Sequence, residues 1–369
     1  MIHAVLSALL FGVSAPLAKL LLARVDPMVL AGLLYLGAGA FLGTLALASR
    51  VRSPLRREPG LERRDLPWLA GATAAGGVAG PILLLLGLRT TPAATASLLL
   101  NFEVVATALI ARALFREAVG GRTWIAVAAV CAGGTLLSLD LGAGWGFAPG
   151  ALLIVAACAC WGLDNNLTRP VSLRDPKLVT VVKGLVAGAF SLALASGLGR
   201  ALPSCTTAIL ALGVGAVGYG ASIALFVRSL RDLGAARTGA VFAAAPFAGA
   251  ALSFALFPER PRAFFYGGAI LMGLALALLV RERHAHPHVH EPFFHTHAHV
   301  HDEHHAHAHA PGTEEAGRHT HSHAHARLEH AHPHSPDLHH RHSHRAARRA
   351  EVGTPSEPRK TGGREGLPF

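Results

Sequence analysis

Apolar residues in this chain gather into ten long runs, and the short segments between them carry most of the charge. Each run is about 18–22 residues long, close to the roughly 20 helical residues that span a hydrocarbon core. Gly and Ala are abundant inside the runs, as is usual where helices pack closely in lipid. The pattern predicts an all-α membrane protein with ten transmembrane helices. The runs begin near His3, Met28, Pro67, Ala93, Gly121, Ala148, Leu178, Ala208, Ala235 and Arg262.

The Lys and Arg residues of the connecting segments are unevenly divided between the two sides of the membrane. With a cytosolic N-terminus, the four inner connections carry fifteen basic residues and the five outer connections carry five. Because basic residues are retained in short cytosolic loops, we expect a multi-pass protein whose N- and C-termini are both cytosolic.

The formal net charge of +11 does not indicate a nucleic-acid-binding protein. The excess falls in the inner connections, where anionic lipid headgroups are the natural counter-charge. The sequence contains no GxSxG, Walker or HExxH motif, so we predict neither an enzyme nor direct use of ATP, and no required cofactor. The expected partners are a small-molecule substrate and the lipid bilayer, and the oligomeric state stays open.

Short motifs in the first five runs recur in the last five, 142 to 150 residues later. Phe11–Ser14 aligns with Trp161–Asp164, and Leu88–Arg89 aligns with Leu230–Arg231. Because five is odd, the second copy would enter the membrane from the opposite side. The copies would then be inverted repeats, an architecture of secondary transporters whose substrate site lies near the midplane, where the halves meet.

The five-plus-five plan resembles the EamA-type transporters of the drug/metabolite transporter superfamily. The residues that carry the resemblance are Leu10–Gly12, Lys19, Trp161–Gly162, Glu117, Glu259 and Pro246. The resemblance implies one repeat at 1–140, a second at 148–282, and a bacterial inner-membrane carrier of small metabolites, often an exporter. The family often has a basic residue where Leu34 stands, whereas Lys183 occupies the equivalent position of the second half. Val104 replaces the proline that Pro246 preserves in the other half.

Glu103 is the clearest candidate for a substrate or coupling residue, because it lies near the centre of the fourth run. Polar residues at membrane depth are costly and usually face the bundle interior or a water-filled path. Burial disfavours the charged form of a carboxyl, which suits a group that binds a proton or a cation. A protonated glutamate that hydrogen-bonds a neighbouring helix is the alternative. Asn101, on another face, is a weaker candidate or an interhelical contact.

A second cluster of candidates lies at the end of the sixth run. Asp164, Asn165 and Asn166 belong to the substrate site or mark the inner boundary of this span. Lys183, about six residues into the seventh run, either extends to the inner surface or pairs with Asp164 or Glu103.

Four further residues are predicted to be gate or structural residues. A proline inside the first run would leave backbone carbonyls free to bind a ligand. The acidic residues at the ends of the fourth and ninth runs are expected to form salt bridges or helix caps, and the family resemblance adds the role of a gate. These residues are Pro16, Pro246, Glu117 and Glu259.

The segment 283–369 holds 23 of the 24 histidines and few apolar residues, so we predict that it is disordered. Imidazole suits zinc, nickel and cobalt(II), and the alternating histidines are predicted to bind such ions. A tail without a selected role, or one that becomes cationic and docks on anionic lipid as pH falls, are the alternatives. The candidate ligands are His284, His286, His288, His290, His295, His297, His299, His301, His319, His321, His323 and His325.

Three functions remain open at this point. The main one is a secondary active transporter of small organic metabolites, coupled to protons through Glu103, with a metal-binding tail. The second is an exporter of divalent nickel, cobalt or zinc whose tail collects the ions. The third is a membrane sensor that reports metal to a partner. The runs favour the first, because His3 is the only histidine they contain.

Overall fold

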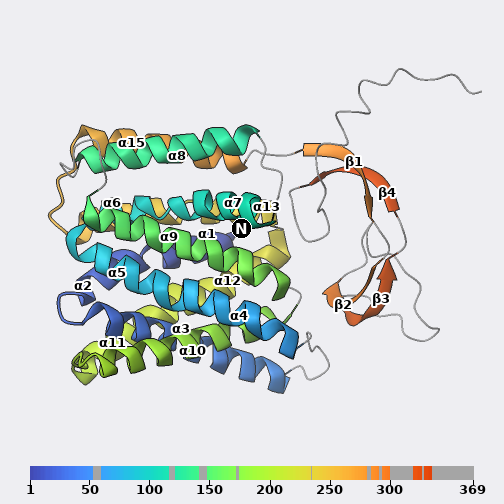
Figure 1. Cartoon of the computed structure of the whole chain (residues 1–369), viewed down its shortest axis with the longest axis horizontal. Coiled ribbons are helices and arrows are strands. Elements are labelled where there is room, and N and C mark those ends of the chain that lie inside the picture. The colour runs from blue at the N-terminus through green and yellow to red at the C-terminus, as the bar shows by residue number, and fades with distance from the viewer. Residues whose placement is uncertain are drawn as a thin grey trace, which may run out of the picture.

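The computed structural model describes residues 1–52, 60–115, 121–140, 148–171, 174–233 and 235–280, and four short segments beyond them. The part up to residue 280 is a helical bundle (Figure 1). Its helices are α1 (Ile2–Gly12), α2 (Ser14–Leu21), α3 (Pro27–Arg52), η1 (Arg63–Asp65), α4 (Leu66–Ala72), η2 (Thr73–Ala79), α5 (Gly80–Thr90), α6 (Ala93–Leu99), α7 (Phe102–Phe115), α8 (Gly121–Asp140), α9 (Pro149–Thr168), η3 (Arg169–Val171), α10 (Pro176–Gly197), α11 (Cys205–Val214), η4 (Gly215–Ala221), α12 (Ser222–Leu233), α13 (Ala235–Phe242), α14 (Ala245–Leu256) and α15 (Ala263–Val280).

Eight helical stretches in these ranges are long and apolar enough to cross a membrane, against the ten that the sequence predicts. They are Ile2–Leu21, Pro27–Ala48, Arg63–Thr90, Ala93–Leu114, Gly121–Leu139, Pro149–Val171, Lys177–Gly197 and Cys205–Ser229. The ninth and tenth predicted spans contain the shorter apolar helices Ala245–Leu256 and Ala263–Leu278. The ninth is short because the chain leaves helical geometry at Ala243 and Ala244, and α14 begins with Pro246 in its first turn. A proline is tolerated in the first turn because the N–H that it lacks would have no intrahelical partner there.

Several of the spans are interrupted rather than continuous. The first breaks at Val13, between α1 and α2, and the fourth breaks at Leu100 and Asn101. The third and eighth each contain a π-helical segment, η2 and η4, which are seven residues long. π-helical turns are rare and are often found at functional sites.

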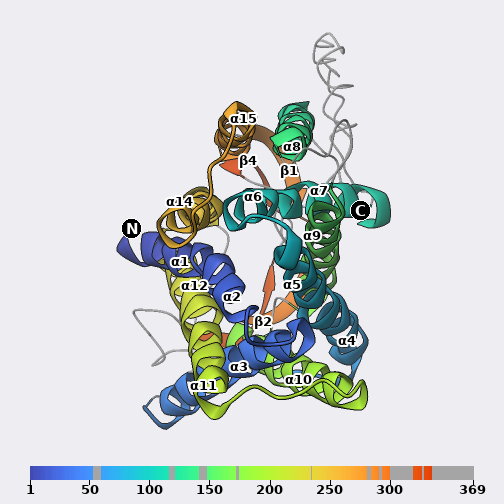
Figure 2. The ribbon, with the colours of Figure 1, turned by 90° about the vertical axis from the view of Figure 1, so that its left-hand side faces the viewer.

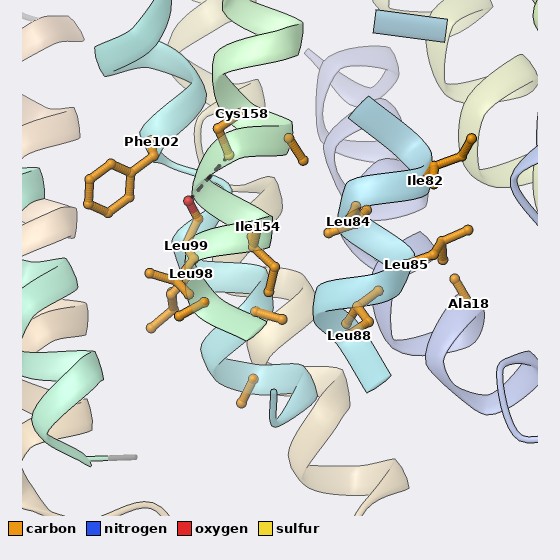
Figure 3. Packing of buried hydrophobic residues seen from close by; sticks show 14 of the residues in the cluster. Ala18, Ile82, Leu84, Leu85, Leu88, Leu98, Leu99, Phe102, Ile154 and Cys158 are labelled. Atoms are coloured by element: carbon orange, nitrogen blue, oxygen red, sulfur yellow. Dashed lines mark hydrogen bonds between the residues drawn. The ribbon is translucent and has the colours of Figure 1, made fainter. Parts of the chain in front are cut away.

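Helices that are far apart in the sequence lie side by side. Helix α3 contacts α10, α8 contacts α15, and α9 lies between α5 and α7 (Figure 2). Figure 3 shows the core where α9 meets the first half: Leu98, Leu99 and Ile154 are buried, and the Cys158 thiol donates a hydrogen bond to the Leu99 carbonyl at 3.6 Å. This packing fixes the position of α9, which carries most of the candidate site.

Beyond residue 283 the structure describes four short strands, β1 (His284–His290), β2 (Phe293–His299), β3 (His319–His325) and β4 (Leu328–His334). Strand β1 pairs antiparallel with β4, and β2 pairs antiparallel with β3. The sequence predicted disorder for all of 283–369, so these four segments differ from the prediction. Their strict two-residue alternation is compatible with a strand, although an isolated two-stranded ladder is only marginally stable in water. The rest of 283–369 lies outside the described residues.

The helices of the bundle end on two opposite sides. The side on which α15, α3 and α12 end, at Val280, Arg52 and Leu233, is called the tail side (Figure 1). The opposite side contains the connections after Leu21 and Thr90.

Candidate functional site

Glu103 meets Asn165 inside the bundle. The Asn165 side-chain amide donates to Glu103 Oε1 at 2.9 Å and to Thr107 Oγ1 at 3.2 Å. The Thr107 hydroxyl donates in turn to the Glu103 backbone carbonyl at 2.8 Å, one helical turn back. This group of three residues, the carboxylate cluster, joins α7 to α9.

Asn165 is exposed, yet it does not lie on the lipid side of α9. On a helical wheel it falls between two packed faces. One face contacts α7, since added atoms at Gly162 would meet the Thr107 backbone. The other contacts η2 through Trp161 and Asp164. The accessible surface of Asn165 therefore faces the space between α7, α9 and η2.

An ion pair lies one residue from Asn165. Lys183 Nζ of α10 and Asp164 Oδ1 of α9 are 2.5 Å apart, and both side chains are largely buried. The Thr168 hydroxyl donates to the same Asp164 oxygen at 2.9 Å. Of the alternatives that the sequence left for Lys183, the structure shows pairing with Asp164 rather than extension to the surface.

Gly76 allows this pair to form, because α9 approaches η2 too closely for any side chain. A Cβ at Gly76 would lie 1.9 Å from Asp164 Oδ2. In this π-helical segment the backbone amides donate to carbonyls five residues back, as the Gly80 amide does to Ala75. The donor for the Gly76 carbonyl would then be residue 81, which is a proline and has no N–H. The Gly76 carbonyl instead accepts hydrogen bonds from Tyr35 Oη at 2.7 Å and Trp161 Nε1 at 2.9 Å.

Aromatic side chains extend from Tyr35 across to the second half. The Tyr35 and Tyr219 rings are 6.0 Å apart, and Phe11 contacts Tyr219 and Phe242 at 5.9 and 5.2 Å. Phe226 packs edge-on against Phe242 at 4.8 Å. These five rings, the aromatic cluster, come from α1, α3, η4, α12 and α13. Sequence reasoning missed them as site residues. One available signal was that Phe11 is the repeat equivalent of Trp161.

A cavity of about 500 Å³ opens between α3, α10 and α12 toward the tail side. Its lining residues lie one or two helical turns from residues already described: Leu42 beyond Tyr35, Thr180 beyond Lys183 and Ile223 beyond Tyr219. Residues three, four or seven apart share a helix face. The cavity therefore lies within one or two helical turns of Tyr35, Lys183 and Tyr219.

Charged residues line the mouth of this cavity. They are Lys177 of α10 and Arg228 and Asp232 of α12. His3 Nδ1 lies 3.3 Å from Asp232 Oδ2, so the first helix and the end of α12 meet there.

Two further predicted site residues, Asn101 and Asn166, make contacts between helices or within one helix. The buried Asn101 amide donates to the Leu98 carbonyl at 2.9 Å and to Met272 Sδ at 3.8 Å, which ties the break in the fourth span to α15. The Asn166 amide donates to the carbonyls of Thr107 and Gly162 at 3.1 and 2.8 Å. Both support helix packing around the site.

Glu259 caps a helix of the opposite half. Its carboxylate accepts hydrogen bonds from the Ala93 and Ala94 amides at 2.5 and 3.0 Å, at the N-terminus of α6. Lys19 lies nearby and donates to the Thr91 carbonyl. The capping interpretation of Glu259 agrees with this geometry. Glu117, its repeat equivalent, lies outside the described residues.

The two predicted proline sites both adjoin helix breaks. Pro16 lies three residues after the break at Val13, and Pro246 lies two residues after the break at Ala244. The Gly12 carbonyl is the one that an amide at position 16 would have bonded, and a proline offers none. This carbonyl lies against Gly249 of α14, where an added Cβ would be 2.5 Å away.

On the tail side, Arg174 joins the two halves of the chain. Its guanidinium lies 2.7 Å from both Glu62 Oε1 and Asp65 Oδ2. The hydrogen bond from Arg174 lowers the pKa of Glu62, and the hydrogen bond to Glu62 raises the pKa of Arg174. Glu62 and Asp65 also form a capping box at the start of η1.

Within the ranges whose side chains the structure describes, no three His, Cys, Asp or Glu residues are grouped to hold a metal ion. The predicted histidine ligands belong to strands whose backbone alone is described. Register places His295 opposite His323 and His297 opposite His321. Metal binding by the tail therefore stays a prediction.

A model of the EamA-like transporter family matches the chain twice, over residues 1–139 and 148–281. The chain belongs to the EamA-like transporter family. The resemblance predicted from the sequence is thereby confirmed, and the function that membership gives is a multi-pass membrane transporter of small molecules.

Two individual proteins are similar to this member of the EamA-like family. An uncharacterized transporter of Methanothermobacter thermautotrophicus is 29% identical over 276 residues, which cover 70% of this chain and 79% of the relative. A crystal structure of a protein with 21% identity covers 76% of this chain and 97% of that one, with a TM-score of 0.54. At that identity the structural likeness shows the fold alone.

Proposed function

We propose that this protein is a proton-coupled secondary transporter of small organic metabolites in the bacterial inner membrane. The observation that carries the proposal is the carboxylate cluster. Glu103 lies in the fourth span and accepts a hydrogen bond from the accessible Asn165, and a cavity between α3, α10 and α12 opens toward the tail side of the same bundle. A carboxyl in such a place can exchange a proton with one compartment at a time, which is what coupled transport requires.

We also propose that the chain consists of two five-helix repeats, residues 1–140 and 148–282, which are inverted with respect to each other. Irregular segments recur at matching positions. The π-helical segments η2 and η4 begin 142 residues apart, and the breaks at Leu100 and Ala243 are 143 apart. Duplicated irregularities support a duplicated origin, because π-helical turns rarely arise by chance at equivalent positions.

The contacts between helices also support two repeats that are related by symmetry. Contact of α5 with α9 is matched by contact of α12 with α1, and contact of η2 with α10 is matched by contact of η4 with α3. Equivalent helices pair with each other in α3 with α10 and in α8 with α15. A pseudo-two-fold axis would generate both kinds of contact, and rocking of one half against the other would then alternate access to the site.

The halves differ at one chemically decisive place. Gly76 packs against Asp164, and its equivalent Gly218 packs against Ser14, where an added Cβ would lie 2.8 Å from the serine Cβ. Only the first of these contacts carries a charge and a lysine partner. Divergence at the substrate site is expected where a symmetric scaffold binds an asymmetric solute.

Export with cytosolic termini is the direction we propose. The excess of basic residues in the predicted inner connections supports a cytosolic tail side, and the cavity opens on that side. A solute taken from the cytosol would meet the site in this conformation.

The test is solid-supported-membrane electrophysiology on proteoliposomes, with a panel of amines, amino acids and organic acids. Wild type is expected to move at least one solute with a dependence on the pH gradient, and Glu103→Gln to lose that dependence. Glu62→Gln, which removes a carboxylate from the tail-side loop, is the matched control. Equal gradient dependence in Glu103→Gln and wild type would rule Glu103 out as the coupling group.

The histidine-rich tail supports a second candidate, an exporter of nickel, cobalt or zinc. The alternating histidines between His284 and His325 are the observation that favours it. Cells that carry the full chain are compared with cells that carry a version cut after Arg283, in graded zinc, nickel and cobalt. Loss of metal tolerance on truncation would support this candidate. If cells with the full chain are no more tolerant than cells without the protein, the candidate is excluded.

A further inference from the structure

Glu103, Asp164 and Lys183 are the charged groups of the region where α9 meets α7, α10 and η2, called the central site, and among these three only Glu103 lacks a charged partner. Asp164 is paired with Lys183 at 2.5 Å, so these two charges cancel. Within the described ranges, the side chain that hydrogen-bonds the Glu103 carboxylate is the neutral Asn165 amide. Among the described residues, no Lys, Arg or His lies within 4.0 Å of it. The ionised site therefore has one uncompensated negative charge, which one positive charge would neutralise.

Aromatic side chains begin one helical turn from Asn165, the hydrogen-bond partner of Glu103. Trp161 stands one turn from Asn165 on α9 and is held by its hydrogen bond to Gly76. Tyr35 donates to the same Gly76 carbonyl as Trp161. The Tyr35 ring contacts Tyr219, and Tyr219 contacts Phe11, so these rings extend across the bundle. Aromatic faces attract cations, and most strongly where water is excluded.

We propose that the central site takes an organic monocation with an aromatic or apolar body, whose ammonium group displaces the proton of Glu103. This inference rests on the transporter function proposed above and adds the substrate class. The exchange is balanced in charge: the carboxyl gives up one proton and accepts one ammonium group. A neutral or anionic solute would leave the carboxylate charge unmatched inside the bundle, at a cost in desolvation.

Other titratable groups around Glu103 do not change the sign of this exchange. Helix α9 brings Asp164 and the Cys158 thiol toward it, and α3 brings the Tyr35 hydroxyl. Helix α8, which also contacts α7, carries Arg122 in its first turn and Cys131 further along. Asp164 is already neutralised by Lys183, so Glu103 remains the group that a proton or an ammonium can occupy.

Three ligands that share a phenyl ring and a two-carbon chain separate the possibilities by charge alone. They are phenethylamine, a cation; phenylalanine, a zwitterion; and 3-phenylpropionate, an anion. Isothermal titration of the full-length protein in detergent gives the affinity for each. Repeating the titration in buffers of different ionisation enthalpy gives the number of protons released.

Phenethylamine is expected to bind best and to release a proton, with tighter binding as pH rises. Glu103→Gln should weaken it about 10- to 100-fold and abolish proton release, because a charge-assisted contact is lost. Glu103→Asp keeps the charge and should retain proton release, which preserves the test if the glutamine variant does not fold. Glu62→Gln should bind as wild type does.

Tighter binding of phenylalanine or 3-phenylpropionate, or no binding of any of the three, would overturn the proposed substrate class. So would binding of phenethylamine without proton release. These outcomes are distinct from failure of the transporter proposal. A pH-gradient dependence that Glu103→Gln removes would leave that function standing, with a substrate of another charge.

Discussion

Replacing Gly76 by alanine tests whether the close approach of α9 to η2 holds the ion pair in place. The new Cβ would lie 1.9 Å from Asp164 Oδ2, 2.4 Å from its Cγ and 2.5 Å from its Cβ. Rotation of the carboxylate removes the first two contacts but leaves the third. To reach an ordinary contact of 3.4 Å, the Asp164 Cβ must retreat by 0.9 Å, and α9 must move with it.

Overpacking of this kind costs about 1–3 kcal/mol. The gain in helix propensity from Gly to Ala is about 0.5–1 kcal/mol, so destabilisation is the net expectation. The displaced Asp164 also loses its 2.5 Å contact with Lys183, and Trp161 is drawn from the Gly76 carbonyl. Transport should fall together with stability.

The assay is reversible unfolding in mixed detergent and dodecyl sulfate micelles, followed by tryptophan fluorescence. Gly43→Ala is the matched control, because its new Cβ would meet only Val181 Cγ1, at an ordinary 3.7 Å. The free energy of unfolding should fall in Gly76→Ala and stay the same or rise slightly in Gly43→Ala. Equal stability of the two variants would refute the claim that α9 and η2 are in this contact.

Three other predictions concern the charged contacts. Lys183→Met should cost about 3–5 kcal/mol of stability in the same unfolding assay, because it leaves a buried carboxylate unpaired; the double variant with Asp164→Leu should recover most of it, and no recovery would argue against a pair. Glu259→Ala should cost about 1 kcal/mol through loss of the α6 cap; Glu259→Gln should cost less, and an unchanged stability of the alanine variant would contradict the cap. The pKa of Glu62 is lowered by Arg174, so the stability it contributes is present above its ordinary value of 4.5 and is lost as pH falls through the lower folded value. Hydrogen exchange at residues 60–65 should accelerate over that acidic range in wild type, and the step should be absent in Glu62→Gln; a step at neutral pH would contradict this assignment.

The sequence predicted the parts of the fold that depend on local pattern. Apolar run length located the eight helical stretches of the described residues that are long and apolar enough to cross a membrane. The motif shared by Phe11–Ser14 and Trp161–Asp164 led to the prediction of a duplication, which stays a prediction. Run length did not reveal the interruptions, because Leu100 and Ala243 are apolar residues and the turns that they form leave no mark in the hydropathy. The ninth span was predicted as one helix, since the hydropathy of Ala235–Leu256 does not change at its break.

At the site, the sequence identified the polar residues that are costly to bury but not the side chains that they contact. Glu103, Asp164 and Lys183 were evident because charges are rare at membrane depth. That Lys183 chooses Asp164 rather than Glu103 depends on the position of α10 relative to α9, which no spacing specifies. Tyr35 and Tyr219 could not be recognised as site residues, because aromatic side chains inside a span are usually packing residues.

The proposed inverted repeats require the two halves of the chain to cross the membrane in opposite senses around the site. Thr90 ends the third span and Asp232 lies at the equivalent point of the eighth, 142 residues later, and both are exposed. Single cysteines at these positions, in a background without the four native cysteines, are labelled with an impermeant maleimide from either side of sealed vesicles. Labelling of position 90 only from the outside and of position 232 only from the cytosolic side is the predicted result. Labelling of both positions from the same side would contradict the account.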